Sequence, residues 1–253
     1  MSNLDEVLVL YININGTVKK ASITSKAFDE ICADNELSPA VFKVELLPGA
    51  EAISGFSYLS NLEEVVVSEG VTSIGIGAFK DCTSLKKVEL PRSLKEIGLK
   101  CFSGCERLES IKIPDKVTKI GDSAFSKCTS LTGVSLPSDL KVLGMNAFAD
   151  CTSLKNIYFT PSLGGFCQFQ SKAFARCTSL EEIFIPRELS LENWTVFEGC
   201  TNVKQIQTPY RTDYSLDLAR YLFSHFPKLE EYKTLNKKFT RDDVAKTNDD
   251  SIR

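Results

Sequence analysis

The sequence contains few of the residues on which metal sites and nucleic-acid interfaces usually depend. Among 253 residues there is one histidine, His225, so a metal site built on two imidazoles is excluded. Lysine and arginine total 30 against 33 aspartates and glutamates, which leaves no basic excess to pair with a phosphate backbone. We therefore expect no metal, no cofactor and no nucleic-acid partner.

Long apolar segments and an export signal are also missing. The sequence has no run of about 18 apolar residues, which a membrane-spanning helix would require. Asp5 and Glu6 occupy the place where a secretory signal would carry basic residues. The sequence thus predicts a cytoplasmic or cytoskeletal protein without a transmembrane segment.

Motifs for catalysis are equally scarce. There is no phosphate-binding Gly-x-x-x-x-Gly-Lys-Ser/Thr segment and no Cys-x-x-Cys pair. A cysteine nucleophile with His225 as its base is one reading. The simpler reading is a structural histidine, because His225 directly precedes Phe226 and Pro227. Neighbouring carboxylates such as Glu63 and Glu64 suit a solvated face, so we expect no enzyme activity.

The most regular feature of the sequence is the spacing of its cysteines. Six of the nine cysteines follow one another at steps of 23, 23, 23, 26 and 23 residues. A phenylalanine stands three residues before each of them, and a leucine or valine three residues after. Such self-similarity is typical of repeat proteins. The six are Cys82, Cys105, Cys128, Cys151, Cys177 and Cys200.

Each repeat divides into a strand, a bend and a second apolar segment. The alternation of Val88 and Leu90 indicates a short strand, which Pro91 ends. Gly98 and its equivalents supply a permissive backbone at the next bend. The Ala-Phe-x-x-Cys-x-x-Leu phrase then places its apolar residues on one face of a helical turn.

A single coil of this kind cannot bury its apolar face, so neighbouring coils must stack. We therefore predict an α/β repeat: a leucine-rich-repeat solenoid of about eight coils, with short strands on one face, helical turns on the other and a cap at each end. Successive cysteines would lie close enough for disulfides or a metal ladder. Leu59 and Phe226 replace cysteine in the same column, which favours buried, inert thiols.

The strand phrase Leu-x-x-Val-x-Leu-Pro, followed by Ile-Gly-x-x-Ala-Phe-x-x-Cys, resembles the BspA-like leucine-rich repeats, the subclass with a 23-residue unit. The resemblance extends from about Leu62 to Glu230. It implies a surface adhesin that binds host matrix proteins or other cells.

Three segments are expected along the chain. Residues 1–43 form an N-terminal cap with a β-hairpin around Asn15-Gly16. Residues 44–235 form the BspA-like leucine-rich repeat solenoid, including a C-terminal helical cap in which a helix spans residues 212–226. Residues 236–253 form a mobile charged tail. A bulge at 161–170 carries Cys167, the thiol expected to be most exposed.

Residues between the inward-facing pair of each strand point outward, and stacking aligns them into columns. Two aromatic residues, Tyr158 and Phe184, fall on neighbouring coils, as an interface core requires. The alternative is that Phe166 or Phe169 from the bulge covers Phe184, which would make the patch internal packing. The predicted partner-binding residues are Tyr158, Phe184, Asn156, Glu182, Gln207, Ser135 and Lys112.

Together these features predict a non-catalytic module that binds a protein partner through its strand-lined face. Adhesion at the cell surface is the role that the family resemblance implies. The alternative is an intracellular structural scaffold, part of a larger cytoskeletal or flagellar assembly.

Overall fold

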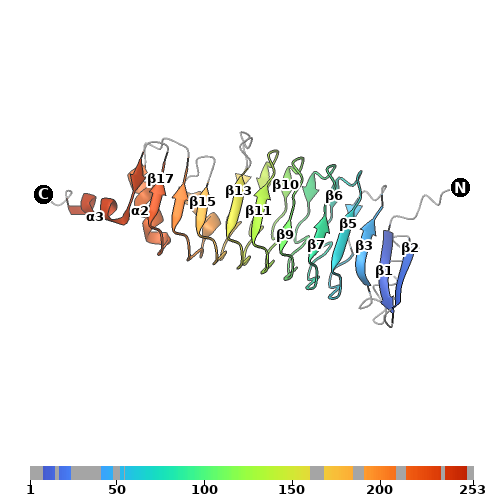
Figure 1. Cartoon of the computed structure of the whole chain (residues 1–253). Helices are drawn as coiled ribbons and strands as arrows, with labels where there is room; N and C mark the ends of the chain where they lie inside the picture. Colours follow the sequence, from blue (N-terminus) through green and yellow to red (C-terminus); the bar gives the residue numbers. More distant parts are fainter. Residues whose placement is uncertain are drawn as a thin grey trace.

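The computed structural model describes residues 8–14, 17–23, 41–47, 52–53, 55–159, 168–184, 191–208, 215–234 and 237–249. The chain winds into an elongated stack of coils, with the β1–β2 hairpin at one end and the α2 and α3 helices at the other (Figure 1). Each coil contributes a strand to one long side of the stack.

We call this side the strand face. From the N-terminal to the C-terminal end of the stack its strands form three sheets, in the orders β2-β1-β3-β5-β7, β9-β11-β13 and β15-β16-β17-β18. All neighbours from β3 onward that share a sheet pair in parallel, except the final antiparallel pair. The strands are β1 (Leu8–Ile14), β2 (Thr17–Ile23), β3 (Val41–Leu46), β5 (Glu64–Val67), β7 (Lys87–Glu89), β9 (Ser110–Ile111), β11 (Gly133–Leu136), β13 (Asn156–Phe159), β15 (Glu182–Phe184), β16 (Gln205–Gln207), β17 (Glu231–Lys233) and β18 (Lys238–Phe239).

A second parallel sheet forms another side of the stack, which we call the back row. Each of its strands has two residues and ends at an apolar residue, which in the regular coils directly precedes the glycine of the bend; the sequence predicted no strand there. The back row consists of β4 (Ala52–Ile53), β6 (Ser73–Ile74), β8 (Glu96–Ile97), β10 (Lys119–Ile120), β12 (Val142–Leu143) and β14 (Gln168–Phe169).

The predicted helical turns are wrong, and the α/β class with them: the chain is a β-solenoid. In the Ala-Phe-x-x-Cys phrase the amide of Phe125 donates to the carbonyl of Ala147 on the next coil at 2.7 Å. Ser123 and Lys127 have positive φ angles of 53° and 62°, and two left-handed residues within five break any α-helix. The described helices are instead the 3-10 helix η2 (Leu191–Phe197) and the α-helices α2 (Ser215–His225) and α3 (Arg241–Asp249).

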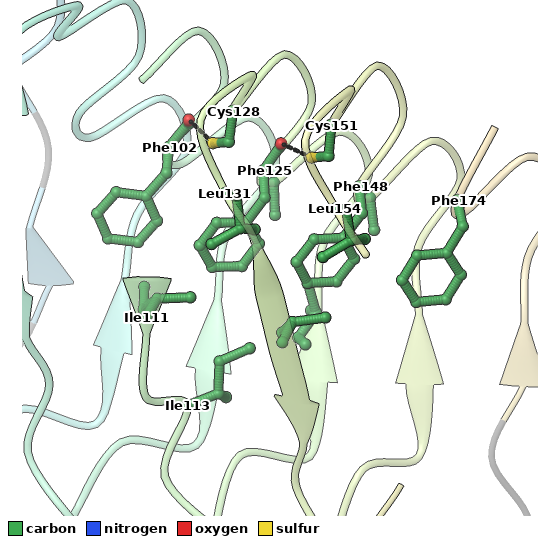
Figure 2. Packing of buried hydrophobic residues seen from close by; sticks show 14 of the residues in the cluster. Phe102, Ile111, Ile113, Phe125, Cys128, Leu131, Phe148, Cys151, Leu154 and Phe174 are labelled. Atoms are coloured by element: carbon green, nitrogen blue, oxygen red, sulfur yellow. Dashed lines mark hydrogen bonds between the residues drawn. The ribbon is translucent and has the colours of Figure 1, made fainter. Parts of the chain in front are cut away.

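The core is built around a stack of phenylalanine rings (Figure 2). Neighbouring ring centroids lie 5.0–5.6 Å apart, with interplanar angles of at most 20°. One ring per coil indicates about seven turns in the described residues, fewer than the eight expected. The rings are Phe56, Phe79, Phe102, Phe125, Phe148, Phe174 and Phe197.

The cysteine column packs beside these rings and makes a hydrogen bond that the sequence did not predict. The thiol of Cys128 donates to the carbonyl of Phe102 on the preceding coil at 3.2 Å, and Cys151 bonds Phe125 in the same way (Figure 2). All seven described cysteines are buried and free of disulfides, which confirms the expected buried thiols. Burial raises the pKa of Cys128 well above its ordinary value, so the reactive thiolate is disfavoured. Cys167 lies outside the described residues.

The repeated glycines on the back row serve close packing, which differs from the expected backbone freedom. Gly98, Gly121 and Gly144 are absent from the described residues with positive φ. A Cβ atom on Gly121 would lie 2.6 Å from the amide nitrogen of Leu99. These glycines therefore let the backbones of neighbouring coils approach more closely than any side chain would permit.

The two ends of the stack are closed differently. At the N-terminal end, β1 pairs antiparallel with both β2 and β3; the turn residues of this hairpin lie outside the described residues. At the C-terminal end lies α2, within the segment expected to be helical. The expected mobile tail instead contains β18 and α3. Phe239 is buried against Tyr232, and the Arg241 guanidinium donates to the carbonyls of Phe223, Phe226, Pro227 and Leu229.

Candidate functional site

The strand face carries the predicted binding residues in two adjacent columns. The sheet register pairs Ser135 with Tyr158 and Gly133 with Asn156, and it pairs Phe184 with Gln207 across β15 and β16. The columns expected from the repeat step are therefore present within each sheet. All seven side chains are exposed: Lys112, Ser135, Asn156, Tyr158, Glu182, Phe184 and Gln207.

The two aromatic residues lie on neighbouring strands without cover from Phe169. Tyr158 is 58% exposed and Phe184 is 42% exposed. Strands β13 and β15 contact each other although they belong to different sheets. Phe169 lies on β14 in the back row, where it is buried at 8% exposure, so it packs inside the solenoid. Phe166 lies outside the described residues.

In the N-terminal part of the strand face, lysines and glutamates of neighbouring strands form ion pairs with one another. The Lys43 ammonium lies 3.4 Å from Glu64, and Lys87 lies 3.0 Å from Glu64 and 2.5 Å from Glu89. The hydrogen bonds with Glu89 and Glu64 raise the pKa of Lys87 to about 12. Because each charge already has a partner of opposite sign, this region offers little unsatisfied charge to a ligand.

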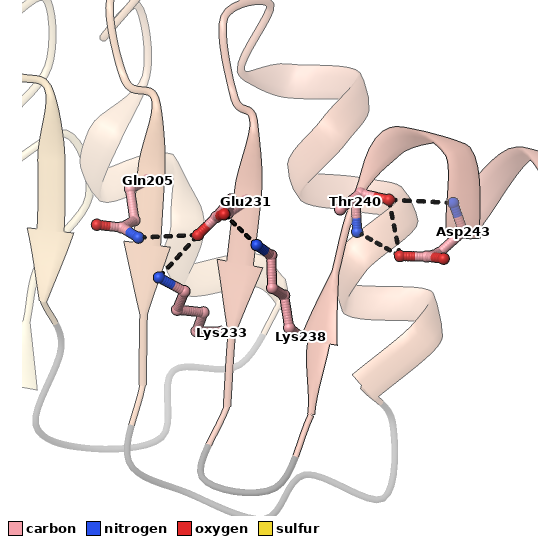
Figure 3. A network of polar contacts seen from close by, with 6 residues as sticks. All are labelled: Gln205, Glu231, Lys233, Lys238, Thr240 and Asp243. Carbon is pink, nitrogen blue, oxygen red and sulfur yellow. Dashed lines mark hydrogen bonds and ion pairs between the residues drawn. The ribbon is translucent and has the colours of Figure 1, made fainter.

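A second charge network lies at the C-terminal end of the strand face (Figure 3). The Glu231 carboxylate accepts from Lys233 at 2.7 Å, from Lys238 and from the Gln205 amide at 3.1 Å. The two lysines hold the pKa of Glu231 at about 2. The sequence predictions missed these lysines and Glu231. The available signal was the 26-residue step that carries Gln205 onto Glu231.

Between these two networks, the positions next to Tyr158 and Phe184 are mainly uncharged, with Lys112 and Glu182 as the charged members of the two columns. Ser110, Gly133 and Ser135 are small, and the exposed rings of Tyr158 and Phe184 rise beside them. An apolar aromatic centre with polar surroundings is the usual composition of a protein interface core.

The structure gives little support to metal or nucleophile chemistry in the part of the chain it describes. No group of three histidine, cysteine, aspartate or glutamate side chains there could hold a metal ion. His225 is exposed at the end of α2, where its ring stacks on Tyr221 at 3.9 Å between centroids and Nδ1 lies 2.8 Å from the Tyr221 carbonyl. The described thiols are buried, so none of them is brought out to His225.

None of the described helices combines the length and the apolar character that crossing a bilayer demands.

The stacked parallel strands, the phenylalanine column and the 23-residue step define the class of this chain as a leucine-rich-repeat β-solenoid. The family profile of the BspA type leucine rich repeat region matches residues 53–168 and 165–242. Because these matches cover well over half of the sequence, the chain belongs to the BspA-type leucine-rich repeat family. None of the curated proteins compared with this chain matches it.

The chain is similar to several solved structures, of which the first described here shows the same kind of fold. A leucine rich cell surface protein from Faecalibacterium prausnitzii A2-165 is 23% identical, with a TM-score of 0.52 over 66% of this chain and 50% of that protein. A T. pallidum leucine rich repeat protein is 26% identical, with a TM-score of 0.46 over 65% and 73% of the two chains. The pneumococcal vaccine antigen PcpA is 19% identical, with a TM-score of 0.44 over 76% and 40%. The chain thus spans half the length of the Faecalibacterium protein.

Proposed function

We propose that this chain is a non-catalytic protein-binding module whose partner contacts the strand face around Tyr158 and Phe184. The observation that carries the proposal is the exposure of these two aromatic side chains on adjacent strands, 58% and 42%. Exposed aromatic side chains lose water favourably on contact and commonly provide most of the binding energy of an interface.

The surroundings of the two rings support the same role. Asn156, Glu182 and Gln207 provide polar groups at the rim, while Gly133 and Ser135 leave room for a partner to reach the rings. On both sides of the two rings, lysines and glutamates of the strand face are already paired with each other, so we expect the contact with the partner to lie between these ion pairs. An elongated repeat surface of this kind supplies contact area without an enclosed reaction chamber.

The test is affinity capture with the full chain immobilised on a resin, from a lysate of the organism of origin. The Tyr158→Ala, Phe184→Ala double variant removes the aromatic centre. The matched control is Ile76→Ala, Met145→Ala, because these residues are 71% and 47% exposed but follow back-row strands. Loss of two interface centres is expected to reduce capture at least tenfold, whereas the control captures as the wild type does.

Both variants should melt close to the wild-type temperature, because all four side chains are at least 42% exposed. Capture that survives the double aromatic substitution would overturn the proposal. So would a large fall in melting temperature that accounts for the lost capture.

The cellular role follows from where the module meets its partner. We propose adhesion at the cell surface, in keeping with the family and with the cell surface protein of Faecalibacterium. A cytoskeletal or flagellar scaffold would instead keep the chain inside the cell. Biotinylation of intact cells with a reagent that does not cross membranes distinguishes the two: an adhesin is labelled, and a scaffold is labelled only after lysis.

A further inference from the structure

A groove of about 570 Å³ lies beside the strand face, where the chain leaves β7 and β9. Its apolar lining comes from Val88, Leu90, Ile113 and Pro114. Two successive repeats build it, because Leu90 and Ile113 occupy the same position in their coils, one 23-residue step apart. The groove is therefore an open apolar trough across two coils.

The rim of this groove carries positive charge that is not neutralised locally. In the described residues, Lys112 and Lys116 have no ion pair and no side-chain hydrogen bond, and Arg92 adds a third cation. Of the two acidic residues on the rim, Glu89 is already paired with Lys87 at 2.5 Å. Glu69 accepts from the Arg92 amide at 2.9 Å and so lies near Arg92, which leaves Asp115 as the acidic residue of the rim beside Lys112 and Lys116.

This arrangement contrasts with the two charge networks of the strand face. Lys43, Lys87 and Lys233 each contact a carboxylate within 4.0 Å. The lysines of the groove thus differ in having their charge available to a ligand. An apolar floor with an unpaired cationic rim fits a chain segment that presents both carboxylates and apolar side chains.

We propose that the groove binds an acidic segment of the protein partner, next to the part of that partner held by Tyr158 and Phe184. This inference rests on the proposed function. The register places β9 two strands from β13, which corresponds to roughly 10 Å between Lys112 and Tyr158 at the usual strand spacing. About three extended residues span that distance, so one short peptide reaches both features.

The probe is the fluorescent peptide Glu-Glu-Glu-Ser-Gly-Phe-Leu, titrated against the full chain in a fluorescence anisotropy assay at low salt. A second peptide with glutamine in place of each glutamate tests the need for carboxylates. The groove variant is Lys112→Glu, Lys116→Glu. The control Lys119→Glu, Lys141→Glu makes the same change of net charge on exposed lysines at the back row.

The wild type is expected to bind the acidic peptide, and the groove variant to bind it on the order of tenfold more weakly. The affinity of the control variant for the acidic peptide should stay within about threefold of the wild-type affinity. The glutamine peptide should bind the wild type as weakly as the acidic peptide binds the groove variant. The net charge of −3 makes general attraction of an acidic peptide unfavourable, so such binding is local.

Three results would each overturn the groove proposal. The groove variant could bind the acidic peptide as tightly as the wild type does, or the control variant could lose as much affinity as the groove variant. The third is that the wild type shows no binding at 1 mM peptide. The proposed function is judged separately by the Tyr158→Ala, Phe184→Ala variant in the capture assay. If capture falls while the groove variant captures normally, the aromatic site stands and the groove fails. If only the groove variant loses capture, the groove stands and the aromatic site fails.

Discussion

Replacing Phe125 with alanine tests whether the phenylalanine stack holds the solenoid together. The ring of Phe125 is fully buried and lies 5.3 Å from the ring of Phe102 and 5.0 Å from that of Phe148. Its removal withdraws apolar area from the core, leaves a cavity and breaks two ring contacts. Truncations of this kind cost about 3–5 kcal/mol of the free energy of unfolding.

The assay is urea unfolding followed by two probes. Trp194 is the only tryptophan in the sequence, is 2% exposed and lies three coils from Phe125, so its fluorescence reports the C-terminal coils. Circular dichroism reports the whole chain. With a denaturant slope of about 3 kcal/mol/M, a loss of about 4 kcal/mol lowers the midpoint by about 1.3 M. If the coils unfold together, both probes shift equally.

The control is Phe184→Ala, which truncates the same side chain at a position that is 42% exposed. We expect it to cost less than about 1 kcal/mol. Equal losses in the two variants would refute the reasoning that the stack supplies the stability. A Trp194 transition that stays at the wild-type midpoint in Phe125→Ala would refute the cooperative coupling of the coils.

Three further predictions concern single features of the fold. Cys128 should resist iodoacetamide in the native chain and react in urea, as read by mass spectrometry; native labelling would contradict its burial. Gly121→Ala should cost about 1–3 kcal/mol in urea unfolding because its Cβ meets backbone at 2.6 Å, whereas Gly133→Ala, with nearest atoms at 3.7 Å, should be nearly neutral. The pKa of Glu231 is lowered to about 2, so its stabilisation is present above its unfolded pKa and lost as the pH falls toward 2. Glu231→Gln should therefore melt below the wild type at pH 7, and the difference should vanish near pH 2; a pH-independent difference would argue against the network.

The sequence predicted the stack well because the same residue types return at a nearly constant step. A phenylalanine every 23 residues leaves little choice but to place Phe102 against Phe125, and the rings do stack at 5.3 Å. The outward columns follow from the same step, so the neighbourhood of Tyr158 could be predicted residue by residue.

The helical turns and the back row could not be predicted for a physical reason. Apolar residues at i, i+1, i+4 and i+7 suit one face of a helix, but they equally suit two tight turns. The residues that decide between these are Ser123 and Lys127, whose positive φ angles are set by hydrogen bonds to the next coil. Neither residue type signals a left-handed backbone. A two-residue strand is also too short to show an alternating pattern.

The spacing of the repeats does not reveal which charged side chains of the binding surface form ion pairs. Lys87 and Lys112 lie in adjoining coils of the same surface, but only Lys87 meets carboxylates. Both side chains are exposed, and only the side-chain geometry separates an ion-paired lysine from an unpaired one. The Arg241 contacts at the C-terminal end likewise depend on how α3 docks.

Photo-crosslinking with the captured partner tests the claimed binding surface most directly. Benzoylphenylalanine is placed at position 158 in one chain and at position 76 in another, since both native side chains are more than half exposed on different sides of the stack. We expect a covalent adduct with the partner from position 158 and none from position 76. An adduct from position 76 without one from position 158 would contradict this expectation.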